Sequence, residues 1–197
     1  GPITDKMFWI DAGELKPSIV ERWEIAPDGL SLVYYVRKGV KFHNGEDLTA
    51  EDVKFGMEQY LRKDTKYIGT RDMIERVEMV DDYTVRLNLA KFQNTLLVSM
   101  WFIGGMMQSP TAYDKFGKAD AQWNPMGTGP FKFVSYDQNT TIKYVRFDGY
   151  WQTGKPYLDG FEQVVIADPT TRLLALQKGE IHAAEALEAK SVSELQQ

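Results

Sequence analysis

The sequence contains no cysteine, which excludes disulfide bonds, thiol nucleophiles and thiolate metal ligands. Histidine is scarce as well: the two residues, His43 and His182, are far apart in sequence and lie in no metal-ligand spacing. No serine lies in a GxSxG elbow. The Gly127-Thr128-Gly129 run lacks the third glycine and the preceding strand of a dinucleotide-binding loop, so it indicates a turn. We therefore expect no catalytic residues, no metal site and no cofactor.

The sequence also lacks an excess of positive charge and a long apolar run. Its formal net charge is −5, which argues against nucleic-acid binding, because such proteins are normally basic. The most apolar stretch, residues 96–108, is too short for a membrane-spanning helix and is expected to be a buried segment. Hydrophobic residues make up 43% of the chain and charged residues 26%, a balance that predicts a globular fold with its own core.

The stretch from Leu30 to Lys63 has the clearest local pattern. Residues 30–37 follow the two-residue period of a strand. His43-Asn44-Gly45 has the composition of a turn, because Asn and Gly tolerate positive φ. Thr49 then precedes a helix whose third residue is Asp52, an arrangement close to a capping box. An apolar face on this helix is predicted from Val53, Met57, Tyr60 and Leu61.

Further elements are predicted on both sides of this stretch. Residues 75–80 and 83–89 flank a turn at Asp81-Asp82 and predict a hairpin, with Val85, Leu87 and Leu89 facing in and Thr84, Arg86 and Asn88 facing out. Residues 15–23 mix Leu15, Ile19, Val20 and Trp23 with polar residues around Pro17, and no element is predicted there. Strands are also expected at 7–10, 131–136, 141–147 and 161–166, a short helix at 111–116, and a helix that starts at Pro169 after an Asp168 cap and ends before Gly179.

Four stretches share their order and spacing with a known family. They are LKPSIVERWEIAPD (15–28), VRKGVKFHNGEDLTAEDVKFGMEQ (36–59), MGTGPFKF (126–133) and DPTTRLLALQKGEIHAA (168–184). In these stretches the sequence resembles the family 5 extracellular solute-binding proteins, the peptide-, nickel- and oligosaccharide-binding subunits of bacterial ABC importers. The family commonly has Asp where His182 stands, at a position whose role looks structural. The shared motifs are mostly architectural and do not name a ligand.

The resemblance implies an α/β fold of the periplasmic-binding-protein-like type II class, present in part. Residues 1–110 would form a small α/β subdomain of lobe I, residues 111–197 a segment of the lobe I core sheet and helices, and the second lobe would be absent. The resemblance further implies a monomeric, non-enzymatic protein that is exported to the periplasm or the outer face of the cytoplasmic membrane, as a lipoprotein. Its implied partners are a small solute such as an oligopeptide and the ABC permease subunits.

The same comparison suggests where ligand contacts lie, by location only, because these positions fall outside the shared motifs. They are Tyr67, Trp101, Phe102, Met106, Gln108 and Glu185. For Trp101, Phe102 and Met106, packing in the core is the competing interpretation and the more favoured one. Tyr67 is expected in a loop, where aromatic residues often serve recognition. Tyr150 and Trp151 are expected to pack against the sheet. We expect weak or no ligand binding by this chain, because closure of two lobes supplies much of the buried contact area.

Two other functions stay open at this stage. The same fold serves as the ligand-sensing domain of bacterial transcription regulators, and a helix-turn-helix encoded upstream would favour that function. An upstream signal peptide with a lipid-accepting Cys would favour the importer. A hydrolase requires a nucleophile or metal set that this sequence does not show. The sequence also leaves open whether the solute is a peptide, a sugar, an opine or a metal chelate.

Overall fold

The computed structural model describes residues 1–62, 71–91, 96–97, 109–121 and 123–187. Among these residues, none of the helices is both long and apolar enough to cross a membrane. The strands are β1 (Phe8–Asp11), β2 (Glu14–Pro17), β3 (Val20–Ile25), β4 (Ser31–Val36), β5 (Ile74–Asp81), β6 (Thr84–Leu89), β7 (Phe131–Asp137), β8 (Thr141–Arg146) and β9 (Gly160–Val164). The helices are α1 (Ala50–Leu61), the 3-10 turn η1 (Arg71–Met73), α3 (Pro110–Ala121) and α4 (Pro169–Gln177).

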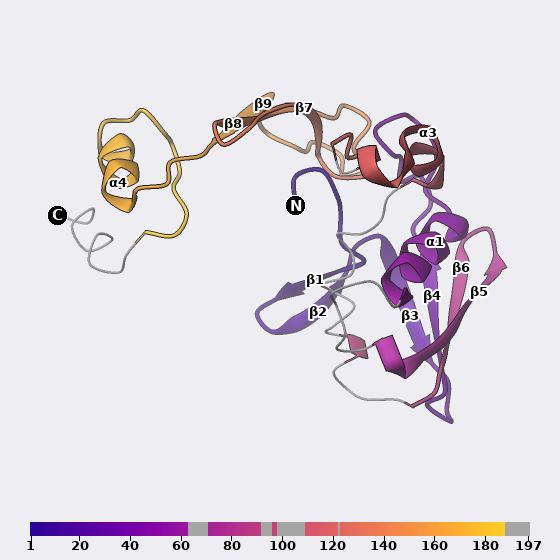
Figure 1. Cartoon of the computed structure of the whole chain (residues 1–197). Helices are drawn as coiled ribbons and strands as arrows, with labels where there is room; N and C mark the ends of the chain where they lie inside the picture. The colour runs from indigo at the N-terminus through magenta and orange to yellow at the C-terminus, as the bar shows by residue number, and fades with distance from the viewer. Residues whose placement is uncertain (63–70, 92–95, 98–108, 122, 188–197) are drawn as a thin grey trace. The chain divides into compact units, whose positions relative to one another are not determined.

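A four-stranded antiparallel sheet, ordered β3-β4-β6-β5, forms the centre of the molecule's core. Leu32 lies opposite Leu87, and Tyr34 lies opposite Val85. Residues directly opposite each other on neighbouring strands share a face, and these four side chains form part of the buried face of the sheet. Helix α1 covers this face (Figure 1). The predicted hairpin at 75–89 is confirmed as β5 and β6. One of its side chains was predicted wrongly: Thr84 was expected to face solvent and is buried.

Helix α1 begins where its capping residues predict. The Asp52 carboxylate accepts hydrogen bonds from the Thr49 backbone N–H at 2.7 Å and from the Thr49 hydroxyl at 3.0 Å. This satisfies a donor that the first turn of a helix would otherwise leave unpaired. The predicted apolar face is confirmed, since Val53, Met57 and Tyr60 are buried against the sheet. Burial of one large apolar side chain contributes about 1.5–3 kcal/mol to stability, and three such side chains hold this helix on the sheet.

Strands β2 and β3 formed where the sequence showed no clear period. The pairing of β3 with β4 shifts register between Val20 and Arg22, and this bulge breaks the two-residue alternation that identifies a strand. A turn at Asp28-Gly29 follows, as this pair of residues favours. Gly29 has φ of +68°, and Asp28 Oδ1 accepts a hydrogen bond from the Leu30 N–H at 2.8 Å.

The later elements also match the predicted pattern, with ends that differ by a few residues. Strands β7, β8 and β9 form a three-stranded sheet in that order. Helix α3 extends beyond the predicted 111–116 and is kinked at Gly117, where φ is 72°. Helix α4 has the predicted cap, with Asp168 Oδ1 accepting from the Thr171 N–H at 2.7 Å, and Gly179 follows its end with φ of +74°.

The chain divides into two compact units. One comprises residues 1–133 and 144–160, and the other comprises residues 134–143 and 161–197. The predicted division at residue 110 concerns the lobes of the family architecture and stays a prediction.

Candidate functional site

The carboxylate of Asp5 is the centre of a buried polar cluster. It accepts hydrogen bonds from the Tyr150 hydroxyl at 2.9 Å, from Trp151 Nε1 at 2.8 Å and from the Thr128 hydroxyl at 3.3 Å. Its side chain has no solvent-exposed surface. Burial raises the pKa of Asp5 above its ordinary 3.8, although the three donors act in the opposite direction. A carboxylate enclosed in this way is out of reach of any ligand and connects parts of the scaffold.

Two glycines beside this cluster let the N-terminal segment approach the 127–131 backbone. The Gly129 N–H donates to the Ile3 carbonyl at 2.8 Å, and the Phe131 N–H donates to the Pro2 carbonyl at 3.0 Å. A Cβ on Gly127 would lie 2.3 Å from the Ile3 oxygen, and one on Gly129 would lie 2.6 Å from the Pro2 oxygen. The two glycines of the MGTGPFKF stretch are therefore required by close backbone contact.

His43 is held in place by the same glycine segment. Its ring Nε2 lies 2.9 Å from the Gly129 carbonyl oxygen, and its backbone N–H donates to the Gly127 oxygen at 3.0 Å. The ring also packs edge-on against Phe147, with 5.0 Å between ring centroids. Burial lowers the pKa of His43. The hydrogen bond with the Gly129 carbonyl acts in the opposite direction, and the positive charge of Lys132 lowers the pKa further. His43 therefore joins two segments, which leaves it poorly placed as a metal ligand or general base.

Tyr150 and Trp151, which the sequence led us to expect in packing roles, are both fixed by Asp5. Trp151 is held on its ring face as well, because the Arg37 guanidinium lies 4.8 Å from its ring centroid. Arg37 Nε in turn donates to the Ser18 carbonyl at 2.9 Å. These contacts confirm that the two aromatic residues belong to the scaffold.

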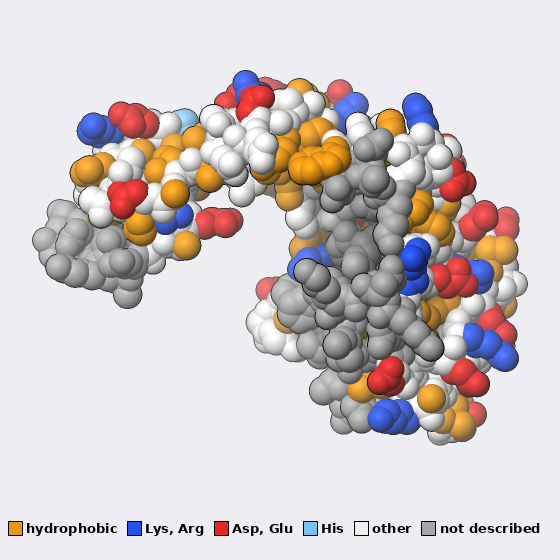
Figure 2. Space-filling view, in the orientation of Figure 1, with side chains coloured by type: hydrophobic (Ala, Val, Ile, Leu, Met, Phe, Trp, Pro, Cys, Tyr) orange, Lys and Arg blue, Asp and Glu red, His pale blue; other side chains and the backbone are white. Residues whose placement is uncertain are grey.

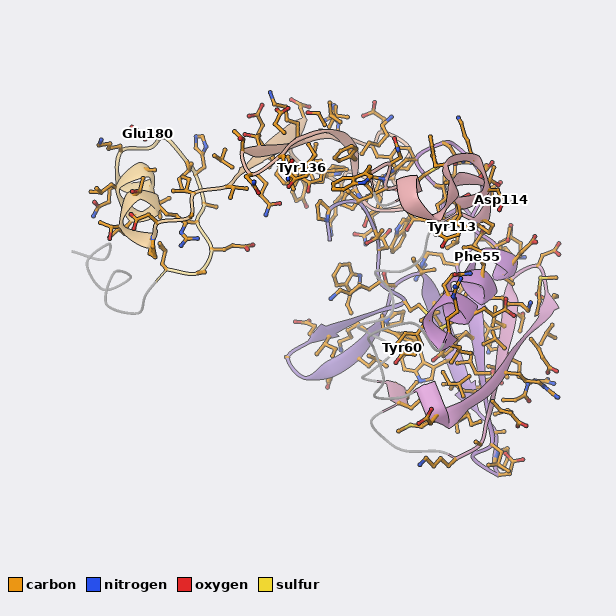
Figure 3. All side chains as sticks on the ribbon, in the orientation of Figure 1. Phe55, Tyr60, Tyr113, Asp114, Tyr136 and Glu180 are labelled. Atoms are coloured by element: carbon orange, nitrogen blue, oxygen red, sulfur yellow. The ribbon has the colours of Figure 1, made fainter. Side chains whose placement is uncertain are left out.

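Aromatic packing also joins helices α1 and α3. The Phe55 and Tyr113 rings meet edge to face, with centroids 5.5 Å apart (Figure 3). Next to this contact, the buried Ser109 hydroxyl donates to Glu46 Oε2 at 3.1 Å. The start of α3 is thus connected to the turn that precedes α1.

An open groove of about 550 Å³ lies at one end of the four-stranded sheet. It carries charges of both signs and two phenol rings, and the Lys38 ammonium lies 5.1 Å from the Tyr83 ring centroid. Hydrogen bonds from the Tyr83 N–H and the Thr84 hydroxyl lower the pKa of Asp81. Sequence reasoning missed this groove, because its walls come from separate segments and share no motif. Its lining residues are Glu21, Tyr35, Val36, Lys38, Asp81, Asp82, Tyr83 and Thr84.

The described residues show no metal centre, and the face seen in Figure 2 carries charges of both signs. Nowhere in this part of the chain do three or more His, Cys, Asp or Glu side chains gather closely enough to hold a metal ion. Figure 2 shows acidic and basic side chains interspersed over the part that carries β3 to β6.

Comparison with known proteins decides the family. The model of the "Bacterial extracellular solute-binding proteins, family 5 Middle" matches residues 14–197. The chain belongs to the family 5 bacterial extracellular solute-binding proteins. The resemblance carried by the four sequence stretches is thereby confirmed.

Two curated relatives show how much of a family 5 protein this chain represents. It is 33% identical to the glutathione-binding protein GsiB of Pectobacterium atrosepticum over 164 residues, covering 82% of this chain and 32% of the relative. It is 34% identical to heme-binding protein A of Haemophilus influenzae over 189 residues, covering 84% of this chain and 34% of that relative. The chain therefore spans about a third of the length of these relatives.

Solved structures agree on the fold. The DppA periplasmic binding protein of Helicobacter pylori, determined in complex with the peptide STSA, matches with a TM-score of 0.85 and 27% identity. The match covers 99% of this chain and 43% of that structure. The expected fold class is thus confirmed: the chain is part of an α/β, periplasmic-binding-protein-like fold of type II.

The predicted ligand-contact residues fall largely outside the structure described here. Glu185 is exposed and lies in an irregular segment that follows α4. All six stay predictions, and five of them lie outside the described residues: Tyr67, Trp101, Phe102, Met106 and Gln108. The residues that the structure does bring together, around Asp5 and His43, serve the scaffold.

Proposed function

We propose that this chain is part of the solute-binding component of a bacterial ABC importer. The protein would capture a small solute outside the cytoplasmic membrane and deliver it to the membrane permease, acting as a monomer and without catalysis. The observation that carries the proposal is the family match over residues 14–197. The structure adds limited support: Thr128 of the shared MGTGPFKF stretch donates to the buried Asp5, so this motif serves the fold.

A peptide is the solute that we favour. The support is the similarity to the DppA protein of Helicobacter pylori, whose structure holds a peptide. Relatives at comparable identity are named for glutathione and for heme, so family membership alone does not select the ligand. We propose that Tyr67, Trp101, Phe102, Met106, Gln108 and Glu185 contribute to the binding surface.

A thermal-shift screen of the full-length protein that contains this chain tests the solute class. Short peptides are expected to raise the melting temperature in a concentration-dependent way, because a ligand that binds only the native state stabilises it by RT ln(1 + [L]/Kd). Oligosaccharides, opines and metal chelates serve as the comparison set. A shift with one of these and none with peptides would overturn the peptide assignment and leave the transport role standing.

Export is tested separately from ligand class. We propose that the full-length protein is exported and anchored as a lipoprotein, so its gene should encode a signal peptide with a lipid-accepting Cys. A helix-turn-helix in the same reading frame would overturn the importer and support the transcription regulator that shares this fold.

A further inference from the structure

The turn before α1 carries the single Asn-Gly pair of the sequence, at Asn44 and Gly45. Both residues are exposed. Gly45 has φ of +92°, and no atom of the described residues other than Gly45 and its two chain neighbours lies within 4 Å of the position that a Cβ there would take. No atom from another segment therefore crowds the Cβ side of Gly45, the residue whose backbone nitrogen the Asn44 side chain must reach. Glycine at the second position also presents no side chain to that approach.

We propose that Asn44 is a site of spontaneous deamidation. The Gly45 backbone nitrogen, after losing its proton, attacks the Asn44 side-chain carbonyl carbon. A bond forms between that nitrogen and Cγ, the bond from Cγ to Nδ2 breaks, and Nδ2 leaves as ammonia once it has taken up a proton. Water then opens the resulting five-membered imide at one of its two carbonyls, which leaves either aspartate or isoaspartate at position 44.

The geometry of the turn favours the addition step. Asn44 Oδ1 accepts a hydrogen bond from the Glu46 N–H at 3.1 Å. Negative charge develops on this same oxygen when the nitrogen adds to Cγ, so the Glu46 N–H is already placed where an oxyanion forms. A preorganised donor at such a position lowers the barrier of acyl chemistry.

One contact acts against the reaction and makes it dependent on pH. The Gly45 N–H donates to the Phe42 carbonyl at 2.9 Å, so this hydrogen bond must open before the nitrogen can lose its proton. The rate should therefore rise with pH, as the fraction of deprotonated amide increases. Because Gly45 lies in an exposed turn, we expect this opening to be a frequent local event that does not need global unfolding.

The isoaspartate product would disturb more than its own position. The turn is closed by the Phe42 N–H to Glu46 carbonyl bond at 2.8 Å, and it meets the glycine segment through the His43 N–H and the Gly127 oxygen at 3.0 Å. Isoaspartate adds one carbon atom to the backbone between these contacts, so both cannot be kept. Either product also adds a negative charge beside Glu46 and Asp47.

Peptide mapping of the aged, folded 197-residue chain tests the proposal. After incubation in mildly alkaline buffer, trypsin releases residues 42–54, which contain Asn44, and residues 133–143, which contain Asn139. Asn139 is a matched internal control, since it is exposed in the turn between β7 and β8 but is followed by Thr140. Mass spectrometry should find deamidated 42–54 accumulating several times faster than deamidated 133–143, and faster at higher pH.

Two outcomes would overturn the proposal. One is deamidation at Asn44 no faster than at Asn139. The other is reaction of Asn44 only in urea-unfolded chain, which would mean that the Gly45 to Phe42 hydrogen bond protects the folded turn. The structural consequence has its own test: the isoaspartate fraction should melt below the N44D variant, whose carboxylate can still accept from the Glu46 N–H. Equal melting temperatures would contradict it.

Discussion

At the scale of single residues, Asp5 joins segments that are far apart in the chain. Its three donors are Thr128, Tyr150 and Trp151. The Trp151 indole N–H can only donate, so it depends on an acceptor in this position. Removing the carboxylate would leave buried donors without partners, and each costs about 1–3 kcal/mol.

We therefore predict that Asp5→Ala lowers the free energy of unfolding by about 3 kcal/mol or more, because more than one buried donor loses its acceptor. Urea denaturation followed by tryptophan fluorescence measures this. Asp11→Ala is the matched control, since Asp11 is exposed in β1, and it should change stability by less than about 0.5 kcal/mol. Equal effects of the two substitutions would contradict the role assigned to Asp5.

The raised pKa of Asp5 also predicts a pH dependence. Between its ordinary value of 3.8 and its higher folded value, the native state binds more protons than the unfolded state. The contribution of Asp5 to stability is thus fully present below 3.8 and decreases as pH rises through the folded pKa. The stability of the wild type relative to Asp5→Asn should fall with rising pH across this window. A difference that is constant over the window would show that the pKa of Asp5 is not raised.

Gly129 gives a second residue-scale prediction. A Cβ there would lie within 2.6 Å of the Pro2 oxygen and 2.5 Å of the Ile3 carbonyl carbon, so Gly129→Ala must displace the backbone. Gly13→Ala is the matched control: its φ of +83° strains the substitution, but the space around it is open. The control should cost about 1–2 kcal/mol, and Gly129→Ala should cost more in the same denaturation experiment. A smaller loss at Gly129 would argue against the close contact.

At the scale of elements, α1 depends on its first turn for its position over the sheet. The Asp52 carboxylate accepts from both the backbone and the hydroxyl of Thr49. Asp52→Ala should therefore lower the free energy of unfolding by about 1 kcal/mol, the usual cost of a lost cap. Glu51 lies in the same turn but is exposed. Glu51→Ala should therefore lower the free energy of unfolding by only about 0.3 kcal/mol, the effect of losing a negative charge near the helix N-terminus. Chemical denaturation monitored by circular dichroism separates the two, and equal losses would show that the cap has no specific role.

At the scale of the whole molecule, the sequence predicted those features whose cause is local. Helix α1, helix α4 and the hairpin of β5 and β6 follow from caps, turns and periodic burial within a few neighbouring residues. Strand β3 was not predicted, because its bulge interrupts the period and its partner lies on another segment. The motif resemblance supplied the fold class that periodicity alone could not.

The polar cluster around Asp5 shows why much of the site could not be predicted. Its partners are separated from Asp5 by 123 to 146 positions in the sequence, and local sequence patterns do not predict contacts over such separations. The sequence did place Tyr150 and Trp151 in packing roles, without indicating that a carboxylate holds them. The predicted ligand contacts were assigned by location in the family, and all six of them, Glu185 included, stay predictions.

The chain covers about a third of the curated relatives it matches, and this leads to an expectation about binding. In two-lobed binding proteins, closure around the ligand supplies much of the buried contact area. A chain that corresponds to about a third of such a protein would carry only part of the surface that encloses the solute. We therefore predict that the scaffold folds and that it binds peptide weakly or not at all.

Isothermal titration calorimetry with the same set of short peptides, on this chain and on the full-length protein, tests this account most directly. The full-length protein should bind at least one peptide, and this chain should give no measurable heat of binding to it under the same conditions. Micromolar peptide binding by the 197-residue chain alone would contradict the account.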